Sequence, residues 1–161
     1  VTPDAVRQAL GHLRTPVRPA QTKKIRFQCF GNFEAFVDNK PLVFKRAKTK
    51  ELLAYLVDRM GSSATMGELM AVIWEDGPDT SSRQSNLRNM IADMKNVLSD
   101  AGVGNIILKN RNSIAIDCAS VDCDYYDFLR HIPYVVNSYH GEYMMQYSWA
   151  EITTAALPWL G

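Results

Sequence analysis

The first pattern along the chain is an alternation of apolar and polar positions that begins at Ile25. The stretch "IRFQCF" places Ile25, Phe27 and Cys29 on one face, which is typical of a half-buried strand. The stretches "FEAFV" and "PLVF" follow, joined by a hairpin-type turn at residues 38–40. The pattern therefore predicts a small antiparallel sheet of three short strands.

Helical spacing replaces this alternation in the middle of the chain. "KTKELLAYLVDRMG" predicts a helix that ends at Gly61, and "MGELMAVIW" predicts a second one. A long third helix is predicted over "DTSSRQSNLRNMIADMKNVLSDAG", residues 79–102. "NIILKNRNSIAID" then predicts two strands around residues 110–112, a β-hairpin. The apolar face of the first helix consists of Leu52, Leu53, Leu56, Val57 and Met60.

Both ends of the chain are predicted to be mainly helical. Residues 3–13 are predicted to form a short helix whose single apolar stripe would need a preceding domain to pack on, and residues 14–24, "RTPVRPAQTKK", are predicted to be a linker. "VDCDYYDFLRH" predicts a further short helix. The closing "YHGEYMMQYSWAEITTAALPWLG" is predicted to be helical except at Gly141 and Pro158. The chain begins with valine, which indicates a fragment of a longer protein.

This order of elements predicts an α+β fold. Residues 25–118 contain an N-terminal three-stranded antiparallel sheet, three helices and a C-terminal β-hairpin, and residues 119–161 form a helical extension. The second and third helices are expected to pack as a helix-turn-helix with the basic hairpin beside them. The loop "EDGPD" between those helices is acidic and would sit poorly against phosphate, so it is expected to point away from an anionic ligand or toward a partner protein.

The third helix carries a polar face of unusual composition. Its buried stripe is Leu87, Ile91, Met94 and Leu98, at helical spacing. The opposite face holds short amides and hydroxyls rather than the usual Glu and Lys. Asn can pair with an adenine edge, Ser can reach a base or a phosphate, and Arg or Lys can bind phosphate. The helix therefore predicts nucleic-acid contact, against the alternative of an ordinary solvated surface. The polar positions are Ser82, Ser85, Asn86, Asn89, Asp93 and Asn96, with Arg88 and Lys95 on one flank.

Residues outside that face complete the predicted DNA-binding set. The hairpin tip offers Lys109 and Arg111 to the DNA backbone or the minor groove. Two roles are proposed for Trp74: its indole N–H donates to a phosphate, or its ring packs in the core. Both can hold, because the ring and its N–H face different ways. Arg83 and Asn112 also belong to the predicted set.

The net charge of +1 is uninformative, but its distribution is uneven. Residues 1–60 hold 12 Lys or Arg and 5 Asp or Glu, whereas residues 61–161 hold 6 and 12. A basic and an acidic half can present different faces to different partners, unless the clustering is accidental. A group of cations before and within the first helix could supply positive potential near DNA: Lys45, Arg46, Lys48 and Lys50.

The cysteines and the lack of a signal peptide or membrane-spanning run indicate a cytoplasmic chain. The chain has three cysteines, Cys29, Cys118 and Cys123, and an odd number favours free thiols in a reducing compartment. Cys118 and Cys123 lack a second ligand pair, so structural thiols are favoured over a metal site. No catalytic residues and no cofactor are predicted. His12, His131 and His140 lack an acid or nucleophile pattern, and no Gly-rich phosphate loop is present.

Several stretches in order resemble a known family. "FKRAKTKELLAYLVDRMG", "ELMAVIW", "SNLRNMIADMKNVL" and "ILKNRNSIAI" resemble the winged-helix output domain of OmpR/PhoB-type response regulators, and more closely the version in Streptomyces antibiotic regulatory proteins. "VDCDYYDFL" and "YHGEYMMQYSWAE" resemble the start of a bacterial transcriptional activation domain. Residues 1–13 resemble the last helix of a phosphorylatable receiver domain.

The resemblance implies a function as a sequence-specific, DNA-binding transcriptional regulator of a two-component phosphorelay. The third helix would enter the major groove, the hairpin would be the wing, and two copies would bind repeated half-sites as a homodimer on DNA. The sequence departs from the family at Asp93, where family members often carry Arg; Asp93 would accept from cytosine or pair with a nearby Arg. The implied groove-facing positions are Ser85, Asn86, Asn89, Met90, Asp93 and Lys95.

The alternative hypothesis is a protein-interaction module on a winged-helix scaffold, with the acidic C-terminal half as its surface. RNA polymerase is a candidate partner, because the closing segment either contacts it or caps the core. The aromatic residues of this segment either pack on the winged helix or form a partner surface. These residues are Tyr139, Tyr143, Tyr147, Trp149 and Trp159.

Overall fold

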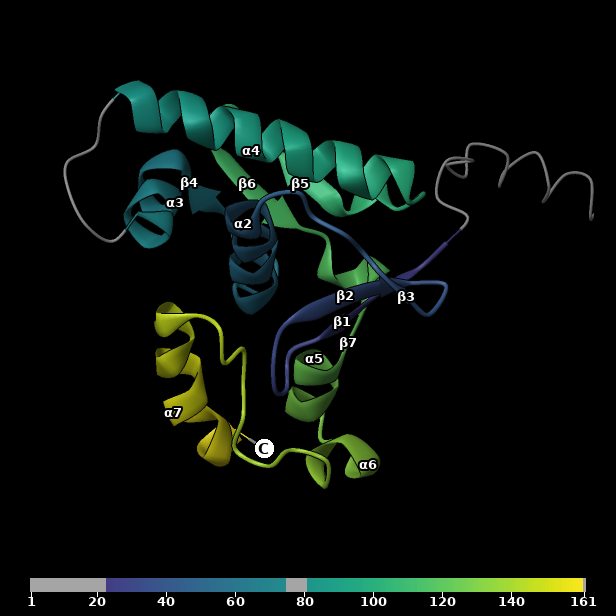
Figure 1. Ribbon diagram of the computed structural model, residues 1–161. Helices are drawn as coiled ribbons and strands as arrows, with labels where there is room; N and C mark the ends of the chain where they lie inside the picture. The colour runs from purple at the N-terminus through teal and green to yellow at the C-terminus, as the bar shows by residue number, and fades with distance from the viewer. Residues whose placement is uncertain (1–22, 75–80, 161) are drawn as a thin grey trace, which may run out of the picture.

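The computed structural model describes residues 23–74 and 81–160, without the side chains of residues 158–160. The predicted helix at residues 3–13, most of the linker and the "EDGPD" loop lie outside the described residues. The described chain contains two small sheets, three helices within residues 47–100, and a helical C-terminal part (Figure 1). None of the described helices has both the length and the apolar character that a membrane span requires.

The first sheet has four strands in the order β3-β2-β1-β7. Strands β1 (Ile25–Gln28), β2 (Glu34–Val37) and β3 (Lys40–Pro41) are antiparallel, as predicted. The fourth strand, β7 (Asp122–Cys123), was not expected, and it pairs parallel to β1. A strand of two residues is too short to produce an alternating pattern, so the sequence did not predict β7. The prediction was also wrong for the end of "PLVF", because the chain leaves the sheet after β3 and Val43 is 82% exposed.

Three helices follow the first sheet, as the helical spacing predicted. They are α2 (Ala47–Asp58), α3 (Met66–Ile73) and α4 (Ser81–Asp100). Thr65 is the N-cap of α3 and accepts the Glu68 backbone N–H at 3.1 Å. Met60, which the pattern placed on the apolar face, lies beyond α2 with a positive φ and is 45% exposed. The predicted apolar face is otherwise confirmed, with Leu52, Leu53, Leu56 and Val57 fully buried.

The long helix α4 lies across α2, α3 and the second sheet (Figure 1). Its predicted stripe is confirmed: Leu87, Ile91, Met94 and Leu98 are all buried. Burial of this stripe orients the helix, because every side chain on the opposite face must then point outward. The core therefore sets which residues of α4 are accessible.

The second sheet has the order β4-β6-β5 and contains the predicted hairpin. Strands β5 (Ile107–Lys109) and β6 (Ser113–Ile116) are antiparallel, with the turn at residues 110–112. Asn110 N–H donates to the Ser113 carbonyl at 2.8 Å and closes this turn. Strand β4 (Ala64–Thr65), immediately before α3, pairs with β6 and was not expected. It joins the start of α3 to the hairpin.

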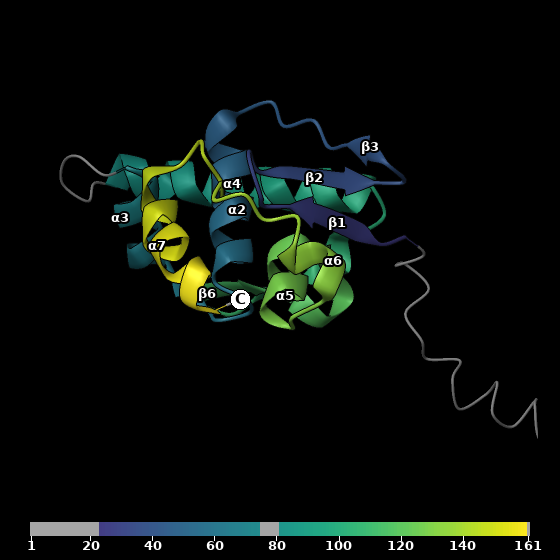
Figure 2. The same cartoon turned by 90° about the horizontal axis from the view of Figure 1, so that it is seen from below.

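The C-terminal part contains α5 (Asp124–Leu129), α6 (Pro133–Val136) and α7 (Glu151–Leu160). The 3-10 turns at Gly104–Ile106, Cys118–Ser120 and Ser148–Ala150 complete the described elements. Seen from below, α5 and α6 lie near β1 and α7 lies beside α2 (Figure 2). Helix α6 was not predicted, whereas the helix in "VDCDYYDFLRH" is confirmed as α5.

The predicted helix over the closing segment is wrong for residues 139–147. Gly141 and Met144 have positive φ, so the chain cannot continue as a right-handed helix there. The backbone instead binds the end of the first sheet: Met144 N–H donates to the Cys29 carbonyl at 2.8 Å and Met145 N–H to the Gly31 carbonyl at 3.0 Å. Pro158, expected to interrupt a helix, lies within α7.

The aromatic side chains of the closing segment pack within this chain. Tyr139 contacts the rings of Phe30 and Phe128, at centroid distances of 4.9 and 5.2 Å. Trp149 packs edge-on against Tyr55 at 5.1 Å and donates its indole N–H to Glu51. These contacts support the packing interpretation of the cluster. The side chain of Trp159 lies outside the described ones.

Candidate nucleic-acid interface

A surface groove separates α4 from the hairpin. It has a volume of about 410 Å³, and four exposed cations contribute to its walls, two from each element. None of its lining residues in the described part of the chain is acidic. The groove is lined by Met66, Arg88, Ile91, Ala92, Lys95, Lys109, Arg111 and Asn112. Five of these residues belong to the DNA-binding set predicted from the sequence.

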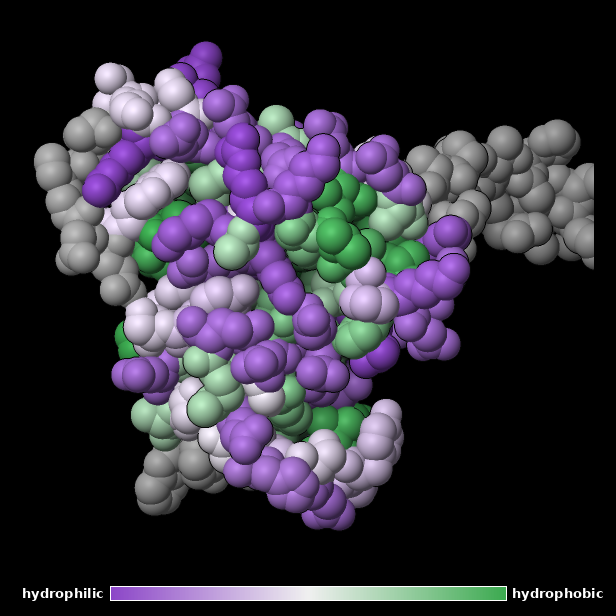
Figure 3. All heavy atoms as spheres, in the orientation of Figure 1, coloured by the Kyte–Doolittle hydropathy of each residue, from purple (hydrophilic) through white to green (hydrophobic). Residues whose placement is uncertain are grey.

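The polar face of α4 lies beside this groove and is open to solvent. The helical projection is confirmed here, because the amides and hydroxyls opposite the buried stripe are all exposed. Hydrophilic residues gather along α4 on the face shown in Figure 3. Side chains of this kind can both donate and accept hydrogen bonds, as recognition of base edges requires. The exposed positions are Ser82, Ser85, Asn86, Asn89 and Asn96.

Two positions that the resemblance implied to face the major groove of DNA are not fully exposed in the structure. Met90 is only 2% exposed and belongs to the core, so that assignment is wrong. Asp93 is half-buried, and its Oδ2 accepts a hydrogen bond from Thr49 Oγ1 at 3.1 Å. The carboxylate of Asp93 is thus turned toward α2 instead of pairing with an Arg.

The Thr49 hydroxyl makes a structural contact to α4 that the sequence did not indicate. Thr49 is fully buried and ties α2 to the middle of α4. Its position was predictable in principle, because it precedes Leu52, Leu53 and Leu56 at the spacings that share one helix face. No role was assigned to Thr49 from the sequence, because a polar residue was not counted with the apolar face of this helix.

Replacing Thr49 with Val is expected to destabilise the fold by about 1–2 kcal/mol, because the Asp93 carboxylate loses a partner while the packing volume is kept. Urea denaturation followed by circular dichroism measures the change in the free energy of unfolding. In an Asp93→Ala background the same substitution should cost little. Equal costs in both backgrounds would mean that the Thr49–Asp93 hydrogen bond does not stabilise the protein.

The hairpin tip is held by backbone contacts to α3. Met66 N–H donates to the Asn112 carbonyl at 3.2 Å, and Lys109 Nζ donates to the carbonyls of Asn110 and Arg111. The first of these contacts ties the tip to the start of α3, and the other two lie within the hairpin. Asn112 contributes to this arrangement through its main chain, a role that its side-chain chemistry did not indicate.

The fold of this chain is similar to that of EmbR. The solved structure "Mycobacterium tuberculosis EmbR in complex with low affinity phosphopeptide" matches 84% of this chain with a TM-score of 0.69, at 16% sequence identity. At such identity the likeness concerns the fold alone. No protein-family model and no curated protein matches the sequence.

The likeness to EmbR extends beyond the predicted DNA-binding unit. Residues 25–118 make up less than two thirds of this chain, so a match over 84% of it includes part of the C-terminal extension. The match spans 42% of the EmbR chain, which is less than half of that protein's length.

A second cleft, of about 790 Å³, lies away from the groove, where the start of α2 meets the end of α3. Trp74 and Arg83 line this cleft and not the groove, although Arg83 lies in the first turn of α4 beside Ser82. Trp74 is half-buried and packs against the core, as one of its two proposed roles required.

The cations of α2 divide between two environments. Lys48 and Lys50 line the second cleft and already have partners: Lys48 Nζ donates to the Ile73 carbonyl at 2.8 Å, and Lys50 pairs with Glu34. Lys45 and Arg46, just before α2, are exposed. None of these four lines the groove between α4 and the hairpin.

Proposed function

We propose that this protein is a DNA-binding transcriptional regulator of the OmpR/PhoB and Streptomyces antibiotic regulatory protein kind. The observation that carries the proposal is the groove whose two walls, α4 and the hairpin, each supply two exposed cations and no acidic side chain among the described residues. Phosphate binding is the electrostatic basis of protein–DNA affinity. The sequence resemblance and the EmbR-like fold support the same function.

In this proposal α4 enters the major groove and the hairpin is the wing. Asn89, Asn86 and Ser85 read base edges, while Arg88, Lys95, Lys109 and Arg111 bind phosphates on either side. Asp93 takes no part in base recognition, because Thr49 engages its carboxylate. The peripheral predicted residues Ser82, Arg83, Trp74 and Asn112 would contact the backbone or support the interface.

The proposal extends to the organisation of the whole regulator. Residues 25–118 would bind DNA as the output part of a two-component response regulator, and residues 119–161 would be the start of an activation domain. Phosphorylation would take place in a receiver domain to which residues 1–13 belong. Two copies would bind repeated half-sites, because one module alone covers little DNA.

A fluorescence-anisotropy titration with promoter DNA at two salt concentrations tests direct DNA binding. We expect affinity to fall steeply as salt increases, since released counterions drive the association. A random duplex of the same length and charge measures the non-specific part. Undetectable binding at low salt, or binding insensitive to salt, would refute the proposal.

Asn89→Ala and Lys109→Ala are expected to have different effects within the same titration. Loss of the Asn89 amide should reduce specific binding by about 1–3 kcal/mol and leave random-duplex binding nearly unchanged. Loss of the Lys109 charge should weaken specific and random duplexes alike and lower the salt slope by about 1. If both substitutions acted equally on both duplexes, the assignment of base and phosphate contacts would be wrong.

The second candidate function is a protein-interaction module, with RNA polymerase as one candidate partner. Exposed apolar side chains in the extension favour it: Met145 is 62% and Ile152 82% exposed. A pull-down with purified RNA polymerase in the absence of DNA tests this function. Retention that is lost in Ile152→Asp, with the anisotropy titration showing no DNA binding, would favour it over the first.

A further inference from the structure

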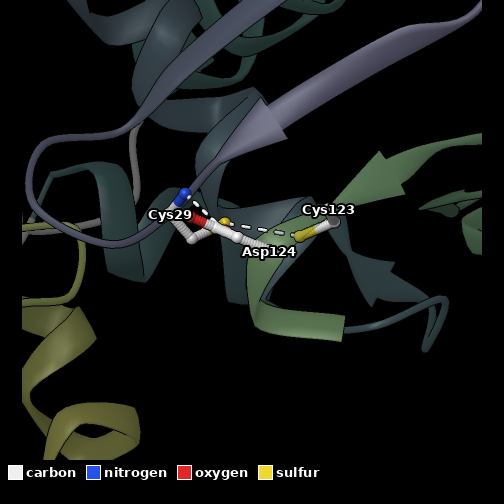
Figure 4. A group of neighbouring side chains, drawn as sticks. All are labelled: Cys29, Cys123 and Asp124. Carbon is white, nitrogen blue, oxygen red and sulfur yellow. Dashed lines mark hydrogen bonds between the residues drawn. The ribbon is translucent and has the colours of Figure 1, made fainter. Parts of the chain in front are cut away.

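Two buried cysteines from distant parts of the chain meet beside the first sheet. Cys29 follows β1 and Cys123 ends β7, and their sulfur atoms are 3.5 Å apart although the residues are 94 positions apart in the sequence (Figure 4). Cys29 is fully buried and Cys123 is 2% exposed. Both are free thiols. The pairing of β7 with β1 thus brings together two thiols that neither spacing nor sequence pattern connects.

The carboxylate of Asp124 lies against this pair, with one ligand atom from each of the three residues within 4.8 Å of the others (Figure 4). It accepts the backbone N–H groups of Cys29 at 2.8 Å, Phe30 at 3.1 Å and Tyr125 at 2.7 Å. These contacts hold the start of α5 against the end of β1. Burial raises the pKa of Cys29 well above its usual value, so the thiol remains protonated in the closed fold.

We propose that Cys29 and Cys123 are an oxidisable pair that closes to a disulfide across β1 and β7. A disulfide bond is about 2.05 Å long, so the two sulfur atoms need to approach by roughly 1.5 Å from their present separation. With a peroxide as oxidant, both S–H bonds break and one S–S bond forms. When the oxidant is hydrogen peroxide, the two electrons and two protons pass to it, and its O–O bond breaks to give two molecules of water.

Burial sets the rate of this reaction and protects its product. The thiols must be exposed before a peroxide reaches them, and β7 pairs with β1 through only two residue pairs. Opening such a short strand disrupts far fewer contacts than global unfolding does. Once formed, the disulfide returns to the same buried position, where reductants have little access to it.

A metal ion at the same residues is the less favoured occupant. A structural zinc site needs four ligands, and within residues 23–74 and 81–160 this group offers one thiol from each cysteine and one carboxylate. That carboxylate already accepts three backbone N–H groups. Both thiols would also have to lose their protons in a buried setting, where the groups that act on Cys29 are Cys123 and Asp124 and neither is a cation.

The disulfide would join the two parts of the protein that the proposed function separates. Cys29 belongs to the predicted DNA-binding unit, and Cys123 belongs to the extension. A cross-link between them closes a long loop and so restricts the unfolded chain strongly. The oxidised protein should therefore be more stable to heat, whether or not it binds DNA.

The experiment uses the whole chain, reduced and then treated with hydrogen peroxide under native conditions. Peptide mapping by mass spectrometry without reductant should give a Cys29–Cys123 cross-linked peptide that is lighter by two hydrogens. The melting temperature should rise by roughly 10 °C in the wild type. Cys118→Ser should show the same rise, because Cys118 lies outside the pair, while Cys29→Ser and Cys123→Ser should show none.

Peptide mapping of the oxidised wild-type protein tests the proposal even if a serine variant fails to fold. Absence of the cross-linked peptide after prolonged oxidation of folded protein would overturn the proposal. Equal yields of cross-links through Cys118 would also overturn it, because they would show unfolded-chain chemistry. Stoichiometric uptake of Cd²⁺ by the reduced protein that requires both Cys29 and Cys123, without a cross-link after oxidation, would replace the disulfide with a metal site.

Discussion

Replacing Lys95 and Arg111 together with alanine is expected to weaken DNA binding by roughly 10- to 100-fold at moderate salt. These residues contribute one exposed cation from each wall of the groove, Lys95 from α4 and Arg111 from the hairpin tip. If each binds a phosphate, the slope of log affinity against log salt should also fall by about 2. Fluorescence anisotropy at several salt concentrations measures both quantities.

The matched control removes two exposed cations from outside the groove. Lys40 in β3 and Arg130 at the end of α5 are both exposed and are not among the groove residues. Lys40→Ala with Arg130→Ala changes the net charge by the same amount, so it measures the general electrostatic contribution. Equal losses in the two double variants would mean that net charge, and not the groove, determines binding.

Replacing Tyr143 with Ala is expected to destabilise the fold by about 3–5 kcal/mol, through the loss of a large buried ring and the cavity left behind. Tyr143 is 1% exposed and contacts the Tyr125 ring at a centroid distance of 5.0 Å. Its hydroxyl donates to Asp58 Oδ1 at 2.7 Å, at the end of α2. Burial raises the pKa of Tyr143 well above its usual range, so this hydroxyl stays protonated.

Tyr143→Phe separates the ring from the hydroxyl. It should cost only about 1–2 kcal/mol, because Asp58 keeps a second donor, the Thr153 hydroxyl at 2.7 Å. Urea denaturation gives the free energy of unfolding for both variants. A single cooperative transition that shifts as a whole is expected if residues 119–161 and residues 25–118 unfold together. A loss confined to a separate early transition would show that the extension is only loosely attached.

The helices and the hairpin were predictable because their signals are local. The stripe of α4 has the period of a helix, and its burial follows from that period alone. The turn at residues 110–112 lies between two short apolar runs, which is sufficient to predict a hairpin. The exposed amides Asn86 and Asn89 were found in the same way, because a residue opposite a buried stripe must face solvent.

The larger failures of prediction, β7 and residues 139–147, concern contacts between distant segments. Strand β7 is too short to show a period, and it exists because β1 has a free edge that the chain reaches again about 95 residues later. The segment at residues 139–147 has helix-forming residues, yet hydrogen bonds to the sheet at Cys29 and Gly31 override their preference. Local propensity is weak compared with such tertiary contacts.

Local patterns in the sequence were sufficient for the α+β class, for the order of the three long central elements α2, α3 and α4 with the hairpin after them, and for the polar face of α4. What lies next to that face depends on contacts between distant segments. The tertiary structure brought the hairpin cations beside α4, turned Asp93 toward Thr49, and placed Cys29 next to Cys123. The physical reason is that periodicity reports how a segment divides between core and solvent, whereas the partner across a groove depends on the packing of the whole chain.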